Sequence, residues 1–245
     1  GVMMRTVNGD RGIFDAEDLR AAIRPIKRNA PTSRMLSIEN TSNAGGGTVW
    51  PLEKVAEVCD AAHEAQLKCH MDGARLLNAV VASGTPAIDY AKHLDSLWID
   101  LSKGLGCPIG AVLAGSSDFI EEAFRLKHLL GGAMRQSGII AAAGVYALEH
   151  NMDRLAEDHG NARHLARRLA QIPGIKIDAS DVETNLVFFD ITATDRTAPE
   201  ISEALKAQGI FIGAVNGSRM RAVTHLGISQ SMVDEAADTM SKVLN

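Results

Sequence analysis

The stretch from Ser96 to Gly115, SLWIDLSKGLGCPIGAVLAG, indicates the fold of this chain because two strand-like runs flank a turn that contains one lysine. The run SLWIDLS (96–102) is typical of a strand, and GAVLAG (110–115) forms another after a turn rich in glycine. Lys103 stands where the first strand ends. A lysine there is either a solvated turn residue or a buried reactive amine, and these residues alone leave both interpretations open.

Outward from this stretch, short strands alternate with helices from Arg34 onward, which predicts an α/β fold with a mostly parallel sheet. RMLSIE (34–39) and LKCHMD (67–72) are further strands, and Pro51 begins a helix with an apolar stripe. Three more helices are expected, over 74–84, 117–128 and 139–150. The last is too apolar for a surface helix, so we expect it to be buried or at an interface.

A charged helical stretch, Met152–Gln171, ends before Pro173-Gly174 and indicates the passage to a second unit. The order of elements beyond it, β, β, α, β, β, α, is typical of a small α+β domain. The segments are IKID (175–178), NLVFFDI (185–191), ISEALKAQ (201–208), IFIG (210–213), MRAVTH (220–225) and a helix from Ser231. We therefore predict a large domain over 1–151 and a small C-terminal domain over 152–245.

The composition and net charge of the chain limit the classes of partner that we expect. The chain has 245 residues, a formal net charge of -5 and a pI near 5.9. Because phosphate backbones and anionic membranes favour basic surfaces, we expect no nucleic-acid partner and no membrane association, and a small molecule as the ligand. Three cysteines without CxxC spacing suggest neither a disulfide framework nor a zinc site, and a reducing cytoplasm is the simplest location. No apolar run approaches membrane-spanning length, and the first residues lack a signal-peptide pattern.

Asp72 ends one predicted strand, just as Lys103 follows another. Ligands of open α/β sheets gather at the carboxyl ends of strands, so both side chains are expected to face one crevice. Pyridoxal phosphate uses this pair of groups, a lysine that binds its aldehyde and a carboxylate that keeps its pyridine nitrogen protonated. An Asp or a Lys before Gly is also a common turn former, and the two residues alone leave that alternative open.

Four motifs in the sequence resemble those of a known family, and this resemblance favours the cofactor-binding interpretation of Lys103 and Asp72. They are HMDGARLLNA (70–79), LSKGLGCPIGAVLAG (101–115), LLGGAMRQSGIIAAAGVYALEH (129–150) and RAVTHLGIS (221–229). They resemble the low-specificity L-threonine aldolases, which belong to the β-eliminating lyase group of the fold-type-I, aspartate-aminotransferase-like enzymes. The resemblance implies pyridoxal 5'-phosphate as the cofactor, bound by the large domain.

The resemblance also implies roles for individual residues. Lys103 corresponds to the Schiff-base lysine, Asp72 to the partner of the pyridine nitrogen, and Arg75 to a residue near the phenolic oxygen of the cofactor. Arg221 corresponds to the arginine that binds the substrate carboxylate, a task suited to a planar fork of donors; its alternative is a surface ion pair. Arg135 corresponds to an arginine near the cofactor phosphate that reaches across a subunit boundary.

Ser102 is expected to add a hydroxyl contact to the phosphate or to act only in the turn. His70 and His225 alternate with apolar strand residues, and we interpret both as structural. The sequence departs from the family pattern at Thr41-Ser42-Asn43, where relatives have Thr-His-Asn. Relatives also have a further segment before the point that matches Gly1, with a phosphate loop and a ring-stacking histidine. We therefore expect this chain alone to bind the cofactor poorly.

The implied reaction is retro-aldol cleavage of L-threonine, L-allo-threonine or a related β-hydroxy-α-amino acid to glycine and an aldehyde, by a homodimer or homotetramer. Fold and cofactor do not fix the chemistry, so β-elimination and transamination remain alternatives. A truncated, non-catalytic subunit is a third. No metal ion is predicted for the site.

Overall fold

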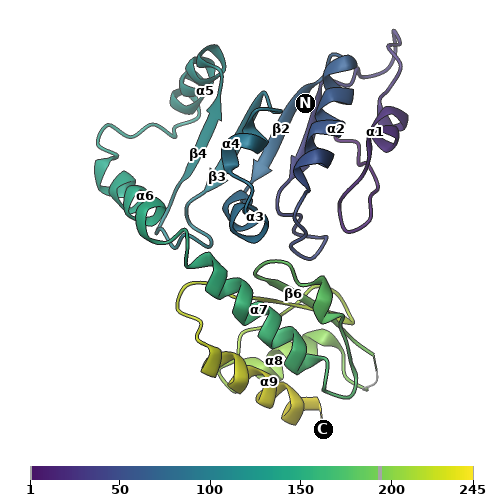
Figure 1. The fold of residues 1–245 in the computed structure, drawn as a ribbon, viewed down its shortest axis with the longest axis vertical. Coiled ribbons are helices and arrows are strands. Elements are labelled where there is room, and N and C mark those ends of the chain that lie inside the picture. The colour runs from purple at the N-terminus through teal and green to yellow at the C-terminus, as the bar shows by residue number, and fades with distance from the viewer. Residues whose placement is uncertain (1, 193–194, 245) are drawn as a thin grey trace. The chain divides into compact units, whose positions relative to one another are not determined.

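The computed structural model describes residues 2–192 and 195–244, and it divides into two compact units (Figure 1). The first unit comprises the chain up to Gly45 together with Val49–Met152, and the second comprises Gly46–Thr48 together with the residues from Asp153 onward. Each unit has its own apolar core. The assignment of cofactor binding to the first unit stays a prediction.

A four-stranded sheet forms the first unit, in the order β1-β2-β3-β4. Its strands are β1 (Met35–Glu39), β2 (Lys68–Gly73), β3 (Ser96–Asp100) and β4 (Ala111–Gly115). The pairs β1–β2 and β2–β3 are parallel, whereas β4 runs antiparallel to β3. The prediction of a mostly parallel α/β sheet is therefore confirmed, with β4 as the exception. A connection of ten residues without a helix is too short for the crossover that a parallel return needs.

Helix α2 (Leu52–Glu64) covers this sheet through an apolar face that includes Val55, Val58 and Cys59. Figure 1 shows α2 beside β2; α3 (Leu76–Ser83) also packs on β2, and α4 (Ala87–Ala91) packs against α2 and α3. Helix α3 ends as the sequence predicts, because Gly84 takes the left-handed conformation there. The structure adds α1 (Ala16–Ala22) and α4, which the sequence patterns did not indicate.

Helices α5 (Ser117–Leu129) and α6 (Gly138–His150) lie beside β4, away from the α2 side of the sheet (Figure 1). Of the two alternatives for the apolar helix over 139–150, burial within this chain does not hold for most of its large side chains. Ile139 is 90% exposed, and Tyr146 is 61% exposed. Strand β4 is exposed along its whole length, and α5 buries no residue. Such a continuous apolar surface is typical of an interface, which was the other interpretation.

The second unit packs α7 (Leu155–Leu169), α8 (Ala198–Lys206) and α9 (Gln230–Leu244) against an antiparallel sheet in the order β5-β6-β8-β7. Its strands are β5 (Ile175–Lys176), β6 (Leu186–Ile191), β7 (Gly213–Ala214) and β8 (Arg219–Val223), with a 3-10 turn over Ala179–Asp181. In Figure 1, α7 and α9 lie side by side in this unit. The small α+β architecture thus agrees with the sequence pattern. None of the helices in the described part of the chain is long and apolar enough to span a bilayer.

The predicted strand IFIG is wrong over most of its length, because only Gly213 belongs to a strand. The Ile210 N–H donates to the Leu205 carbonyl at the end of α8, and the Ser202 hydroxyl donates to the Ile212 carbonyl. These bonds tie the segment to α8 instead of to β8. Ile212 supplies the apolar contact to the core, whereas Phe211 is exposed.

Acid is expected to destabilise the second unit through His159, which is 2% exposed on the inner face of α7. Burial, aided by the charge of Arg163, lowers the pKa of His159 to about 4. Because the folded pKa lies below the unfolded value, the stabilisation is complete above pH 6.5 and is lost as the pH falls toward 4, an effect of about 3 kcal/mol. Urea unfolding between pH 7 and pH 4 measures it.

The matched variants are His159→Gln, which should remove most of this pH dependence, and His150→Gln, which changes an exposed histidine and should keep it. Asp158 acts in the opposite direction, because burial raises the pKa of its carboxyl against the effect of Arg154. Its contribution is present in all three proteins and cancels in the comparison. An unchanged slope in the His159→Gln protein would refute the assignment.

Candidate functional site

The carboxyl ends of β1, β2 and β3 bring polar residues to one edge of the first unit's sheet. Glu39 ends β1 opposite Asp72 of β2, and Asp72 is paired in register with Trp98 of β3. The backbone of the following turns is joined as well, since Asn40 N–H donates to the Asp72 carbonyl (2.9 Å) and Arg75 N–H donates to the Asn40 carbonyl (3.3 Å). This edge is where ligands of parallel α/β sheets bind.

Lys103 follows β3 and turns back toward that strand. Its Nζ lies 3.0 Å from Asp100 Oδ2 and 5.4 Å from the centre of the Trp98 ring. Trp98 and Asp72 are register partners on neighbouring parallel strands, so their side chains leave the same face of the sheet about 5 Å apart at the backbone. The Trp98 side chain is therefore close to the Lys103 amine and next to the Asp72 side chain on the sheet. That the two groups face one crevice stays a prediction.

Asp100 organises the turn that carries Lys103. Its Oδ1 accepts hydrogen bonds from both the Ser102 hydroxyl (2.6 Å) and the Ser102 N–H (2.7 Å), while Oδ2 pairs with Lys103. Burial by itself raises the pKa of the Asp100 carboxyl, but the bonds from Ser102 and the Lys103 ammonium lower it below its usual value. In this structure the Ser102 hydroxyl is directed to Asp100, and its predicted contact with a phosphate stays a prediction.

Trp98 and Asp100 are the two residues that sequence reasoning missed. Both lie in the strand quoted at the outset, at positions i and i+2, and so they share a face of β3. That period-two relation, together with the i,i+3 spacing from Asp100 to Lys103, is the signal that could have identified them. Together they hold an ammonium group over an aromatic face and against a carboxylate.

The loop between β3 and β4 is closed by its own backbone. Leu101 N–H donates to the Gly110 carbonyl (3.0 Å), and Cys107 N–H donates to the Leu101 carbonyl (2.9 Å). The amide of Asn151 adds a bond to the Leu105 carbonyl (2.7 Å). Lys103 is thus displayed by an ordered loop rather than by a loose turn.

Two buried polar atoms beside Asp72 have no hydrogen-bond partner among the described residues, Asn40 Nδ2 and Thr41 Oγ1. Unpaired buried donors of this kind are uncommon and often face a bound polar group. With the carboxylate of Asp72, the guanidinium of Arg75 and the amine of Lys103, they make a donor and acceptor set of the chemical kind that pyridoxal phosphate requires. The residues at this edge therefore fit that cofactor.

Gly73 keeps this edge in place, and Gly73→Ala is expected to distort it. A Cβ at Gly73 would lie 2.3 Å from the backbone oxygen of Trp98, so β2 and β3 would have to separate. We expect a loss of about 1–3 kcal/mol in the free energy of unfolding, measured with urea. Gly138→Ala is the control, because a Cβ there has nothing within 4 Å. Equal stability of the two variants would contradict the expected clash.

The remaining predicted residues are distributed elsewhere. Arg135 lies in the exposed segment between α5 and α6. Arg221 belongs to β8 of the second unit, in register with Phe188 of β6. Ser102 thus adjoins Lys103 in the turn after β3, and Arg75 follows Asp72 after β2, whereas Arg135 and Arg221 belong to other elements and their roles stay predictions.

Three histidines, the two singled out in the sequence and His128 of α5, have local partners. His70 Nδ1 bonds to the Ser96 hydroxyl (2.8 Å), His128 Nδ1 bonds to the Phe124 carbonyl (3.0 Å) and His225 Nδ1 bonds to the Leu226 carbonyl (2.8 Å). For His70, burial lowers the pKa, so the ring is neutral near pH 7. The structural interpretation of His70 and His225 agrees with these contacts.

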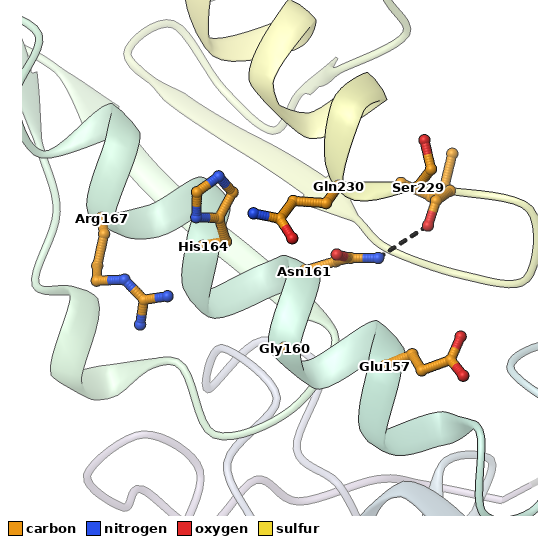
Figure 2. Close-up of a pocket in the computed structure, with 8 residues that line it drawn as sticks. Glu157, Gly160, Asn161, His164, Arg167, Ser229 and Gln230 are labelled. Carbon is orange, nitrogen blue, oxygen red and sulfur yellow. Dashed lines mark hydrogen bonds between the residues drawn. The ribbon is translucent and has the colours of Figure 1, made fainter.

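Figure 2 shows an open, polar pocket within the second unit, and no predicted site residue lines it. Asn161 Nδ2 donates to the Ile228 carbonyl (2.8 Å), and His164 Nε2 bonds to Asp234 (2.8 Å). Asn161 and His164 are therefore held by contacts within the unit itself.

Comparison with known proteins places this geometry in context. The model of the beta-eliminating lyase family matches residues 1–192. Low-specificity L-threonine aldolase 1 of Arabidopsis thaliana is 40% identical over 95% of this chain and 66% of its own length. The low specificity L-threonine aldolase of Escherichia coli (strain K12) is 38% identical over 92% of this chain and 65% of its own. The chain thus spans just under two thirds of these relatives, and the resemblance seen in the motifs is confirmed.

Solved structures agree on the fold. A putative L-allo-threonine aldolase from Listeria monocytogenes EGD-E aligns over 97% of this chain and 67% of its own with a TM-score of 0.76 at 21% identity. A threonine aldolase of Leishmania major aligns over 98% and 70% with a TM-score of 0.73 at 18% identity. The predicted fold-type-I class is confirmed. The family match over most of the sequence and the identity to these relatives establish that this chain belongs to the beta-eliminating lyase family.

Proposed function

We propose that the protein to which this chain belongs cleaves L-threonine, L-allo-threonine or a related β-hydroxy-α-amino acid to glycine and an aldehyde, with pyridoxal 5'-phosphate as cofactor. The observation that carries the proposal is the Lys103 amine, directed at Trp98, the cross-strand neighbour of Asp72. The 36–40% identity to proteins named low-specificity L-threonine aldolases supports it.

Pyridoxal phosphate, when bound, supplies an electron sink for the pair of electrons released as the Cα–Cβ bond of the substrate breaks. Lys103 would hold the cofactor covalently through its Nζ, and the Asp72 carboxylate would keep a proton on the pyridine nitrogen. Arg75 would donate to the phenolic oxygen. Ser102 and Arg135 would contribute hydrogen bonds to the phosphate, with Arg135 reaching a neighbouring subunit.

Arg221 binds the substrate carboxylate through its planar fork of donors. A fixed carboxylate fixes the rotation of the amino acid about its Cα, and this orientation selects which bond breaks. The proposal therefore assigns the choice between retro-aldol cleavage and other reactions to substrate positioning, because the fold does not determine it.

The same proposal extends to assembly and location. Exposed apolar side chains on α5, β4 and α6, among them Phe124, Val112 and Tyr146, suit a homodimer or homotetramer. The three cysteines are buried and unpaired, which suits a reducing cytoplasm. The large cofactor-binding domain corresponds to residues 1–151 and the small domain to 152–245.

Product analysis tests the reaction. The chain, supplied with pyridoxal phosphate, is incubated with L-threonine and with phenylserine, and glycine and the aldehyde are quantified against keto acid and ammonia. Glycine with an equal amount of acetaldehyde or benzaldehyde is the expected result. Keto acid and ammonia from threonine would indicate elimination instead. A chain that forms no product and retains no cofactor on Lys103 after borohydride would be non-catalytic.

A further inference from the structure

A second cluster of chemically active side chains lies at the opposite edge of the first unit's sheet. His63 is near the end of α2, Cys69 is near the start of β2, and Asp95 immediately precedes β3. The amino ends of these parallel strands meet at the edge farthest from Asp72 and Lys103. The cluster takes no part in the proposed reaction.

Its ligand atoms are already close together. His63 Nε2 lies 2.8 Å from Asp95 Oδ2, and these atoms and Cys69 Sγ all lie within 4.8 Å of one another. The Cys69 side chain is buried at 1% exposure, while the His63 and Asp95 side chains are 43% and 26% exposed. The Cys69 thiol is therefore the buried member of the cluster, and solvent reaches the cluster through His63 and Asp95.

From this arrangement we propose that His63, Cys69 and Asp95 bind a zinc ion at the amino edge of the sheet. Thiolate, imidazole and carboxylate are the three protein ligand types of zinc, with bonds of about 2.3, 2.0 and 2.1 Å. A tetrahedral site of these bond lengths separates the ligand atoms by about 3.4–3.6 Å. Small side-chain rotations reach that spacing, opening the imidazole–carboxylate contact and drawing in the sulfur. The fourth position belongs to a water molecule, since the Cys59 thiol is outside this set.

The charges of the cluster suit a divalent cation. Zinc binding requires the Cys69 thiol to lose its proton to water, after which the thiolate and the carboxylate together neutralise the ion. The Asp95 carboxylate accepts a hydrogen bond from the Cys69 N–H and contacts the His63 ring and the Lys68 ammonium. The Cys69 thiol donates to the Cys59 carbonyl at 3.7 Å, a contact that it gives up when it loses its proton to bind the ion.

Lys68 provides the internal check of the proposal. Its Nζ lies 2.6 Å from Asp95 Oδ1, the oxygen that the zinc does not need, and the Cys69 N–H bonds to the other oxygen at 2.8 Å. Both contacts can orient the carboxylate while the metal takes Oδ2. The positive charge of Lys68 also repels the zinc ion, so this lysine lowers the affinity of the site for zinc. A neutral residue at this position should therefore bind zinc more tightly.

Cobalt(II) and zinc titrations of the purified full chain test the site. Cobalt should bind with one-to-one stoichiometry and produce a near-ultraviolet sulfur-to-cobalt band, and added zinc should abolish that band. His63→Gln and Cys69→Ser should each weaken binding at least about tenfold, and Cys69→Ser should also remove the band. Lys68→Gln should strengthen binding several-fold. Cys107→Ser, which changes another buried free cysteine, is the matched control and should leave the titration unchanged.

His63→Gln and Lys68→Gln alter exposed side chains, so they remain informative even if Cys69→Ser fails to fold. Absence of the sulfur-to-cobalt band in the parent chain would overturn the proposal. Equal affinity of the parent and the His63→Gln protein would overturn it as well, and so would weaker binding in Lys68→Gln, because that would mean the lysine supports the metal.

Discussion

Replacement of Lys103 with alanine is expected to abolish covalent retention of pyridoxal phosphate and to lower glycine formation from threonine by at least about 10³-fold. The reason is that no other amine is placed over Trp98 at this edge of the sheet among the described residues. Borohydride reduction followed by peptide mass spectrometry measures retention directly, and it does so whether or not the chain turns over substrate.

Lys92→Ala is the matched control for this experiment. Lys92 also pairs with an aspartate three residues earlier, Asp89 at 2.6 Å, just as Lys103 pairs with Asp100 at 3.0 Å. A loss caused only by breaking an ion pair of this kind would appear in both variants. Cofactor mass found on a peptide without Lys103 in the parent chain would refute the assignment.

Asp72→Asn is expected to lower turnover by about 10²–10³-fold while covalent retention on Lys103 persists. Asparagine keeps the shape of the side chain and an oxygen to accept the Ala74 N–H, which bonds to Asp72 Oδ1 at 3.1 Å, so the turn should survive. It lacks the negative charge that holds a proton on the pyridine nitrogen. The rate of glycine formation and the mass of the reduced peptide separate the two effects.

Asp89→Asn, a change at a half-buried residue of the same unit, should leave both readouts unaltered. Turnover of the Asp72→Asn protein at the parent rate would remove Asp72 from its role, whereas loss of retention in that variant would mean that the residue binds the cofactor mainly as a structural group.

Much of the fold was predictable because its elements are locally encoded. The strands β1, β2 and β3 coincide with short apolar runs of the sequence, and α3 ends at a glycine that takes the left-handed conformation. The direction of β4 depends on the length of the loop before it, which the strand pattern itself does not express. IFIG failed for a tertiary reason, since α8 captures its backbone groups before β8 can pair with them.

The candidate site was predictable to a similar depth. Lys103 and Asp72 can be identified in the sequence because each lies at the end of an apolar strand. The contacts of Asp100 and Trp98 with Lys103 form only when the loop folds back over β3, so the sequence alone does not indicate them. The cluster of His63, Cys69 and Asp95 could not be predicted from cysteine spacing. Its three ligands come from a helix, a strand and the residue before another strand; the pairing of β2 with β3 brings Cys69 to Asp95, and the packing of α2 on the sheet adds His63.

The closed loop after β3 has a thermodynamic consequence. Ordering a residue costs about 1–2 kcal/mol of backbone entropy, and the hydrogen bonds of Leu101, Cys107 and Asn151 mean that this cost is met when the chain folds. A ligand taken up at Lys103 then loses little of its interaction energy to ordering the loop. Affinity at this position should therefore depend strongly on the groups that face the ligand and on the residues that keep the loop closed, such as Gly110, which accepts the Leu101 N–H at φ 124°.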